Sequence, residues 1–117
     1  MLEVIKKATP EVIARLAGEK KAMDTVILKM AEVSLVTDYF IICSANSTTQ
    51  VRAIVDHVEE KLSEAGVEPL HKEGYREGRW VLLDYSECIL HVFVEEDRRF
   101  YNLEQLWGDA EALPYKE

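Results

Sequence analysis

The sequence has few of the residues that build disulfide scaffolds or metal centres. It contains two cysteines and three histidines in 117 residues, without a C-x-x-C pair. Cys43 and Cys88 lie in apolar segments far apart in the chain, so neither a disulfide framework nor a metal site with the usual ligand spacing is predicted. We expect two free, buried thiols in a cytoplasmic protein.

Long hydrophobic runs are also missing. No apolar stretch approaches the ~18 residues of a membrane helix, and Lys6, Lys7 and Pro10 interrupt the beginning of the chain, which argues against a signal peptide and a membrane anchor. With three prolines, five glycines and 48% hydrophobic residues, the composition is neither collagen-like nor disordered. The length fits one domain.

Positive charge is scarce. Lys and Arg number 14 against 22 Asp and Glu, a net charge of −8. Residues 1–21 hold five bases and three acids, or +2, so the remaining residues carry −10. Direct binding to DNA or RNA phosphates needs a basic face and is therefore not predicted. An acidic body fits a basic protein partner.

The hydrophobic periodicity predicts three helices and five strands. Thr9 and Pro10 start a first helix that fades after residue 18. Ser47 and Gln50 match a capping box, which predicts a helix that runs to Gly66. A last helix is predicted over 97–107, with Phe100, Leu103 and Trp107 on one face. The predicted strands cover 25–31, 39–45, 67–73, 79–85 and 88–95.

This element order predicts a single α/β domain over residues 1–108, with a mixed five-stranded sheet flanked by helices. Only Ser86 and Glu87 separate the last two strands, so these should form an antiparallel hairpin. Residues 109–117 are predicted to form a flexible tail.

Motifs for catalysis are absent from the sequence. It has no G-x-S-x-G and no D-x-D, which nucleophilic or two-metal chemistry would favour. The turn from Ser44 to Ser47 could bind an anion at a helix N-terminus, although helix capping alone explains its residues. We predict no catalytic residues, no metal and no cofactor; a nucleotide-binding or nucleotidyltransferase-like enzyme is the alternative.

The strand 79–85 has an unusual pattern. Alternation places Trp80, Leu82 and Asp84 on one face, and Val81, Leu83 and Tyr85 on the other. A buried unpaired carboxylate costs several kcal/mol, so the Asp84 end should be hydrated or paired. Trp beside apolar and acidic residues is typical of a protein interface, but Trp80 could equally fill the core, with Asp84 as a turn acid. Whether His91 is a core histidine or part of a recognition face stays open.

A series of short segments follows in order along the chain: Lys20 to Ala22, Asp38 to Ile42, Ser44 to Ser47, Gly78 to Tyr85, Ile89 to Phe93, Glu95-Glu96, Arg99 to Glu104 and Leu106-Trp107. Together these segments resemble the ribosomal silencing factor family (Iojap-like, RsfS). The resemblance spans about residues 10–108. It implies a protein that binds the large ribosomal subunit through ribosomal protein L-fourteen, blocks its association with the small subunit and represses translation. It also implies a homodimer when free, and a fold similar to nucleotidyltransferases without their catalytic carboxylates.

The resemblance also implies a contact surface. It centres on Trp80 and Asp84, with Val81 and Leu82 between them, and includes Tyr85 and Glu95; His91 and Glu96 match family positions as well. The sequence departs from the family in two places. Ser86-Glu87 stands where Gly-Asp is usual, which affects the turn, and Arg79 stands where an acid is common, which places a positive charge at the edge of the surface. A dimer in which the hairpin face pairs with itself is a further possibility.

Overall fold

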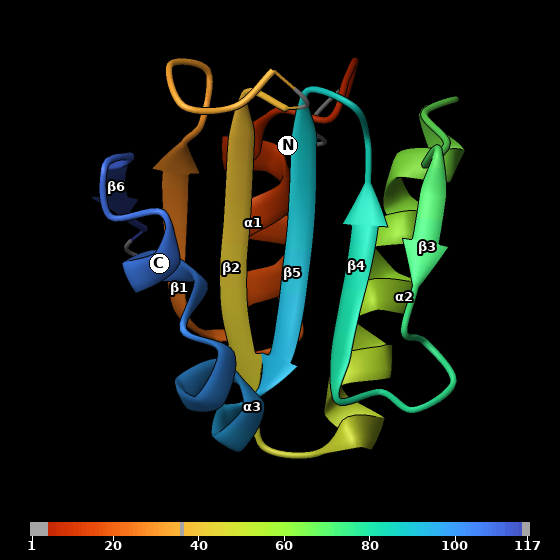
Figure 1. Cartoon of the computed structure of the whole chain (residues 1–117). Coiled ribbons are helices and arrows are strands. Elements are labelled where there is room, and N and C mark those ends of the chain that lie inside the picture. Colours follow the sequence, from red (N-terminus) through yellow and green to blue (C-terminus); the bar gives the residue numbers. More distant parts are fainter. Residues whose placement is uncertain (1–4, 36, 116–117) are drawn as a thin grey trace.

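A mixed six-stranded sheet organises the chain (Figure 1). The computed structural model describes residues 5–35 and 37–115. Its elements are α1 (Pro10–Gly18), β1 (Met23–Lys29), β2 (Tyr39–Ala45), α2 (Thr48–Glu64), β3 (His71–Glu73), β4 (Trp80–Asp84), β5 (Cys88–Val94), α3 (Glu95–Tyr101), α4 (Leu103–Leu106) and β6 (Glu111–Pro114). The strand order is β3-β4-β5-β2-β1-β6. Neighbouring strands are antiparallel except β2 and β5, which are parallel.

The prediction of five strands is wrong, because the segment expected to be a flexible tail contributes a sixth. Residues 111–114 form β6, which pairs antiparallel with β1 through register partners such as Leu28 and Ala112. The segment is short and ends in a proline, which suits an edge strand. Its partner strand β1 lies far away in the sequence, so no local sequence pattern predicts the pairing. Residues 116–117 of the predicted tail lie outside the described residues.

The two long helices begin where their caps predict. The Thr9 hydroxyl accepts a hydrogen bond from the Val12 amide at 3.2 Å. The Ser47 hydroxyl accepts from the Gln50 amide at 3.1 Å, and the Gln50 side-chain oxygen accepts from the Asn46 amide at 2.8 Å. These bonds satisfy amides that the first helical turn leaves without partners.

The single helix predicted over 97–107 is two helices. Asn102 lies between α3 and α4 with a φ of 47° and a ψ of 58°, a left-handed conformation that asparagine tolerates better than most residues. Its side-chain oxygen accepts from the Gln105 amide at 3.4 Å and so caps α4. Two strands also differ from their predicted bounds: β1 begins earlier, and β3 is only three residues long.

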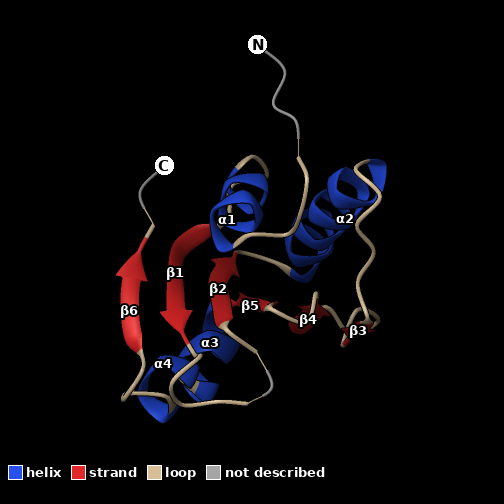
Figure 2. Ribbon diagram, turned by 90° about the horizontal axis from the view of Figure 1, so that it is seen from above, coloured by secondary structure: helices blue, strands red, loops and turns tan. Residues whose placement is uncertain are grey.

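The helices cover the two faces of the sheet unequally, as Figure 2 shows. On one face, α1 and α2 bury the main core. It includes Ile13 and Leu16 of α1, Ile54 and Val58 of α2, and Ile41, Val81, Leu83, Leu90 and Val92 of the sheet. On the opposite face, α3 and α4 cover a smaller cluster formed by Leu28, Met30, Ile42, Phe93 and Leu103. Among the described residues, no helix lies over β3 and β4 on this second face.

The described helices include none that is both long and apolar enough to cross a lipid bilayer.

Candidate protein interface

The uncovered part of the second sheet face is the candidate site. We define the open face as Trp80, Leu82 and Asp84 of β4 together with Phe100 and Tyr101 of α3. The three β4 side chains are half-buried, whereas Val81 and Leu83 between them are fully buried against the helices. The alternation predicted from the sequence is thus confirmed. The side of β4 that carries the tryptophan is the side that the helices leave open.

Trp80 is supported by other aromatic rings. Its indole stacks on Phe93 with ring centroids 4.9 Å apart and an interplanar angle of 23°. The Tyr101 ring lies 4.8 Å from it on the α3 side. The indole nitrogen donates a hydrogen bond to Nδ1 of His91 at 3.1 Å. The ring therefore has a defined orientation while part of it remains accessible to a partner.

A hollow of about 240 Å³ lies beside the indole, lined by Glu73, Gly74, Trp80 and Leu82. Gly74 has a φ of 81°, and a Cβ at this position would collide with the backbone carbonyl oxygen of Trp80. The chain before β4 thus passes Trp80 too closely for a side chain. Most of the exposed wall of the hollow is apolar, so it can accept the aliphatic part of a partner side chain.

Asp84 is the polar end of the open face. One of its carboxylate oxygens accepts a hydrogen bond from the Ser86 amide at 2.7 Å. The residue is half-exposed, so its charge remains partly hydrated. Asp84 is therefore a turn acid, as one of the two sequence interpretations has it, and it still presents negative charge beside Leu82.

Charged residues follow the α3 edge of the open face. Glu95 and Glu96 are exposed in the first turn of α3. Arg79 pairs with Asp97, its Nη2 2.6 Å and its Nε 3.2 Å from the carboxylate oxygens, and lies 3.8 Å from Glu96. The hydrogen bond to Asp97, followed by the charge of Asp97, raises the pKa of Arg79. The positive charge by which this sequence departs from the expected pattern is thus neutralised within the chain.

Two of the predicted contact residues lie on the opposite side of the sheet from the open face. Val81 is fully buried in the main core. Tyr85 packs against the same core on the helix side; its hydroxyl is buried without a hydrogen-bond partner among the described residues, and burial raises its pKa well above the usual value. Strand alternation explains both positions, because odd-numbered residues of this strand face the helices. Trp80, Leu82, Asp84 and Glu95 are accessible.

Phe100 and Tyr101 belong to the open face and were not among the predicted contact residues. Phe100 is 80% exposed, and Leu103 is buried. Helical spacing alone had placed Phe100, Leu103 and Trp107 together. The break at Asn102 separates them, so that Leu103 and Trp107 pack in the second core while Phe100 points outward. The left-handed tendency of asparagine is the signal that could have revealed this.

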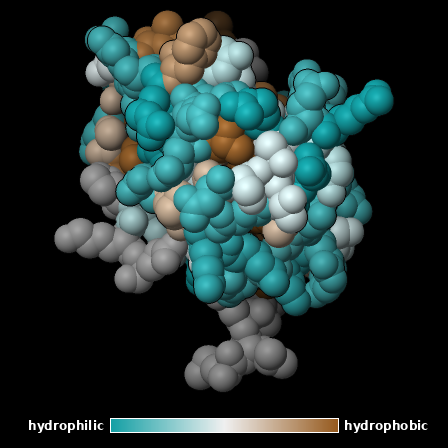
Figure 3. Space-filling model, turned by 90° about the horizontal axis from the view of Figure 1, so that it is seen from below, coloured by the Kyte–Doolittle hydropathy of each residue, from teal (hydrophilic) through white to brown (hydrophobic). Residues whose placement is uncertain are grey.

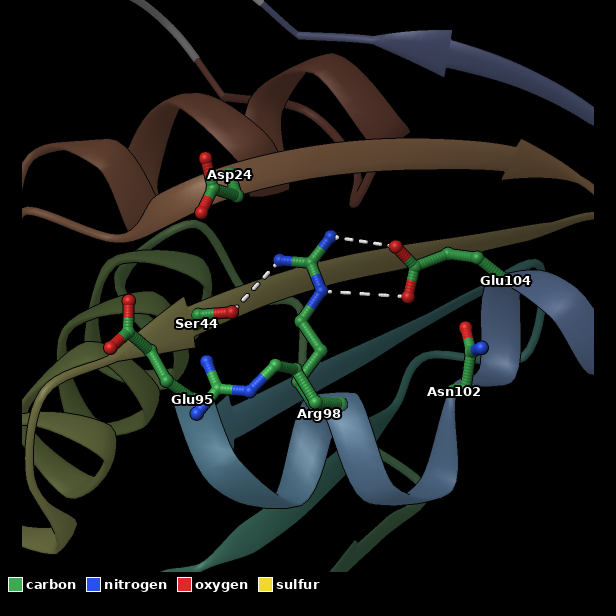
Figure 4. A pocket seen from close by; sticks show the side chains of 7 residues that line it. Asp24, Ser44, Glu95, Arg98, Asn102 and Glu104 are labelled. Atoms are coloured by element: carbon green, nitrogen blue, oxygen red, sulfur yellow. Dashed lines mark hydrogen bonds and ion pairs between the residues drawn. The ribbon is translucent and has the colours of Figure 1, made fainter.

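A second concave region lies where the parallel strands β2 and β5 end. It has a volume of about 450 Å³ and is lined by Asp24, Ser44, Glu95, Arg98, Arg99, Asn102 and Glu104 (Figure 4). Arg98 crosses it: Nη1 donates to the Ser44 hydroxyl at 2.9 Å, and Nε and Nη2 donate to the Glu104 carboxylate at 3.4 and 3.0 Å. Only 11% of the Arg98 side chain is exposed. Because Arg98 bonds both to Ser44 of β2 and to Glu104 of α4, it ties α3 and α4 to the sheet.

The turn that could have supported the enzyme interpretation is engaged in the same structure. Ser44 accepts from Arg98, and Ser47 and Gln50 cap α2. Seen from below, the surface is largely hydrophilic, with hydrophobic atoms at the upper edge of the view and smaller groups near its centre and left (Figure 3). Within residues 5–35 and 37–115, no group of three or more His, Cys, Asp or Glu side chains could hold a metal ion.

An accessible aromatic cluster on a sheet face of an α/β domain, with acidic residues along its edge, is typical of surfaces that contact another macromolecule. The family model described as "Ribosomal silencing factor during starvation" matches residues 5–117. The chain belongs to this family, as the sequence resemblance predicts. The family places it among proteins with a ribosome-associated, translation-silencing role.

Two relatives carry the same family name. A ribosomal silencing factor of Bacillus subtilis is 42% identical over 105 residues, which are 90% of this chain and 89% of the relative. Another, of Halalkalibacterium halodurans, is 46% identical over 95 residues, 81% of each chain. The match thus covers most of the length of these proteins.

A solved structure has the same fold. A crystal structure of a protein from Chromobacterium violaceum superposes with a TM-score of 0.77 at 32% identity, and the match covers 86% of this chain and 88% of the other. The likeness to nucleotidyltransferases stays a prediction.

Proposed function

We propose that this protein binds the large ribosomal subunit through ribosomal protein L-fourteen, blocks association with the small subunit and so represses translation in the cytoplasm. The observation that carries the proposal is the open face. Trp80 is half-buried and stacks on Phe93, and it lies beside an apolar hollow, on the same face of β4 as Asp84. The family membership supplies the ribosome as the partner.

The composition of the open face fits a basic protein surface. Tryptophan and tyrosine are enriched among the residues that contribute most to binding, particularly where a pocket accepts a partner side chain. Asp84 lies next to Leu82, and Glu95 and Glu96 lie at the start of α3. A lysine or arginine of the partner can lay its aliphatic stem in the hollow and its charge against Asp84.

The salt dependence of the binding affinity distinguishes contact with a basic protein from contact with RNA. The chain's net charge of −8 attracts a basic protein but is repelled by ribosomal RNA. Docking through a protein patch should weaken only gently as salt increases. A chain that bound RNA phosphates instead would lose affinity by a factor of about 10³ or more between 50 and 200 mM salt.

The free protein is proposed to be a homodimer. The exposed apolar side chain of Phe100 on the open face is available for self-association. A dimer that covers Trp80 has to open before the ribosome can bind. Light scattering over a range of concentrations measures this state, and a monomer at all concentrations contradicts it.

The test of ribosome binding is co-sedimentation of the full chain with purified large subunits. Trp80→Ala should weaken binding about thirtyfold or more, the usual effect of losing an interface tryptophan. Asp84→Asn removes the charge and keeps the oxygen that accepts from the Ser86 amide, so it tests the charge without breaking the turn.

The matched control is Glu60→Gln, which removes one charge from the exposed side of α2, away from the open face. It should bind as the unmodified chain does. If Trp80→Ala and Asp84→Asn remain folded and also bind as well as the unmodified chain, the open face is not the contact surface.

A further inference from the structure

His91 lies next to the Trp80 indole, buried beneath the open face. It stands on β5, opposite Leu82 of β4 and next to Ile42 of β2. Only 3% of it is exposed. The Phe40 ring lies 4.5 Å from the imidazole and the Trp80 ring 5.9 Å from it. A polar ring is thus enclosed by apolar neighbours directly beside the accessible tryptophan.

The contact with Trp80 fixes the protonation of this histidine. An indole nitrogen can only donate, so His91 Nδ1, 3.1 Å away, must accept. A neutral imidazole that accepts at Nδ1 carries its proton on Nε2. Nε2 is buried and has no hydrogen-bond partner among the described residues. The fold therefore encloses a donor that no described residue accepts.

An unpaired buried N–H destabilises a fold, and an apolar residue of similar size avoids that loss. Leucine would suit this strand and its apolar neighbours better for stability alone. Residues that break a packing rule in this way tend to serve a site. The feature that distinguishes histidine from leucine here is the acceptor nitrogen aimed at Trp80.

We propose that His91 is the positioning residue of the open face. By accepting the indole N–H it holds the Trp80 ring on Phe93 and against Tyr101, in the orientation that a partner meets. A half-exposed ring without this anchor has more freedom to lose on docking, which lowers affinity. This inference rests on the proposed function of the open face for its effect on binding.

The same bond constrains the chemistry of the partner. The indole N–H is already used within the chain, so the partner group opposite Trp80 need not accept a hydrogen bond. The part of the ring that Phe93 and Tyr101 leave accessible is aromatic carbon, which suits the aliphatic stem or the cationic head of a lysine or arginine. This agrees with a basic protein surface.

Two variants separate positioning from packing. His91→Leu keeps the bulk and removes the acceptor. His91→Asn places a side-chain oxygen close to the position of Nδ1 and keeps it. In ¹⁵N-labelled full-length protein, His91→Leu should speed solvent exchange of the Trp80 indole N–H by about tenfold or more, as expected for the loss of one hydrogen bond. The Trp107 indole N–H is the internal control and should not change.

Binding and stability should then move in different directions. His91→Leu should leave the stability against urea equal or higher, and weaken co-sedimentation with purified large subunits by about tenfold. His91→Asn should restore both the protected N–H and the binding. Equal protection of the Trp80 N–H in His91→Leu overturns the inference. So does undiminished binding with a freed indole, or a loss of binding that only follows a loss of stability.

Failure of the proposed function has a different signature. If the unmodified chain does not sediment with large subunits, the proposed partner is wrong. The exchange rate of the Trp80 N–H in the free protein still decides whether His91 positions the ring.

Discussion

Arg79, directly before β4, forms a two-point ion pair with Asp97 in α3, with Nη2 2.6 Å from Oδ1 and Nε 3.2 Å from Oδ2. The Arg79 carbonyl also accepts from the Val94 amide at 2.9 Å. One residue thus connects β4, β5 and α3. Tyr101, a turn further along α3, lies 4.8 Å from the Trp80 ring. The ion pair therefore helps to hold the two sides of the open face together.

Replacing Arg79 should loosen α3. In Arg79→Ala, Asp97 and Glu96 lose their counter-charge and the link to β4, so the amides of residues 95–101 should exchange faster with solvent, and binding to large subunits should weaken a few-fold. Hydrogen exchange measures the first effect. Arg99→Ala is the matched control, because it removes the same charge from the exposed side of the same helix. Equal exchange in the two variants contradicts the role of Arg79.

Ser86→Gly should stabilise the protein. Ser86 has a φ of 73°, in the region that non-glycine residues enter at a cost of about 1 kcal/mol or more. Glycine removes that cost and keeps the amide that donates to Asp84. Urea unfolding should show a gain of about 1 kcal/mol with unchanged ribosome binding. Glu87→Gly is the control, since Glu87 has no positive φ; equal losses in both variants would refute the explanation.

The sequence predicted what depends on neighbours in the chain. The cap of α2 at Ser47 and the alternation of Trp80 with Val81 are local patterns, and both are confirmed. The hairpin is also local, because its turn joins consecutive strands. In each of these cases the residues that determine the structure lie within a few positions of one another.

Long-range packing set the limits of the sequence prediction. The pairing of β6 with β1 joins residues such as Leu28 and Ala112 from opposite ends of the chain. Which side of β4 stays open depends on where α3 and α4 pack, and so does the exposure of Phe100. The sequence left two roles open for His91. In the structure His91 is buried, and its Nδ1 accepts a hydrogen bond from the half-buried Trp80.

The stability of the protein should fall as the solution becomes acidic, and His91 should account for part of this. Burial lowers the pKa of His91 from 6.5 to about 4. Between these values the unfolded chain binds a proton at His91 that the folded chain does not. The contribution of His91 to the free energy of unfolding is therefore fully present above pH 6.5 and is lost as the pH falls toward 4.

The size of this effect can be measured against His91→Leu. Between pH 7 and pH 4.5 the unmodified protein should lose about 2 kcal/mol more free energy of unfolding than the variant. Urea titrations of both proteins at the two pH values give the difference. Parallel losses would mean that carboxylates alone cause the acid sensitivity.

Tyr85→Phe should leave ribosome binding intact. The Tyr85 hydroxyl is buried without a partner among the described residues and faces the helices. Its removal should stabilise the fold by up to about 1 kcal/mol, because an unpaired polar group no longer has to be buried. Thermal unfolding and co-sedimentation with large subunits measure the two effects. If Tyr85→Phe is stably folded but binds large subunits more weakly, Tyr85 is part of the contact surface.

The most direct test of the central claim is the joining of purified ribosomal subunits, followed by light scattering. The unmodified protein, preincubated with large subunits, should reduce joining in proportion to its occupancy. Glu60→Gln should do the same. Trp80→Ala should leave joining almost unaffected, even at concentrations at which the unmodified protein saturates the large subunits. If folded Trp80→Ala blocks joining as well as the unmodified protein does, silencing does not act through the open face.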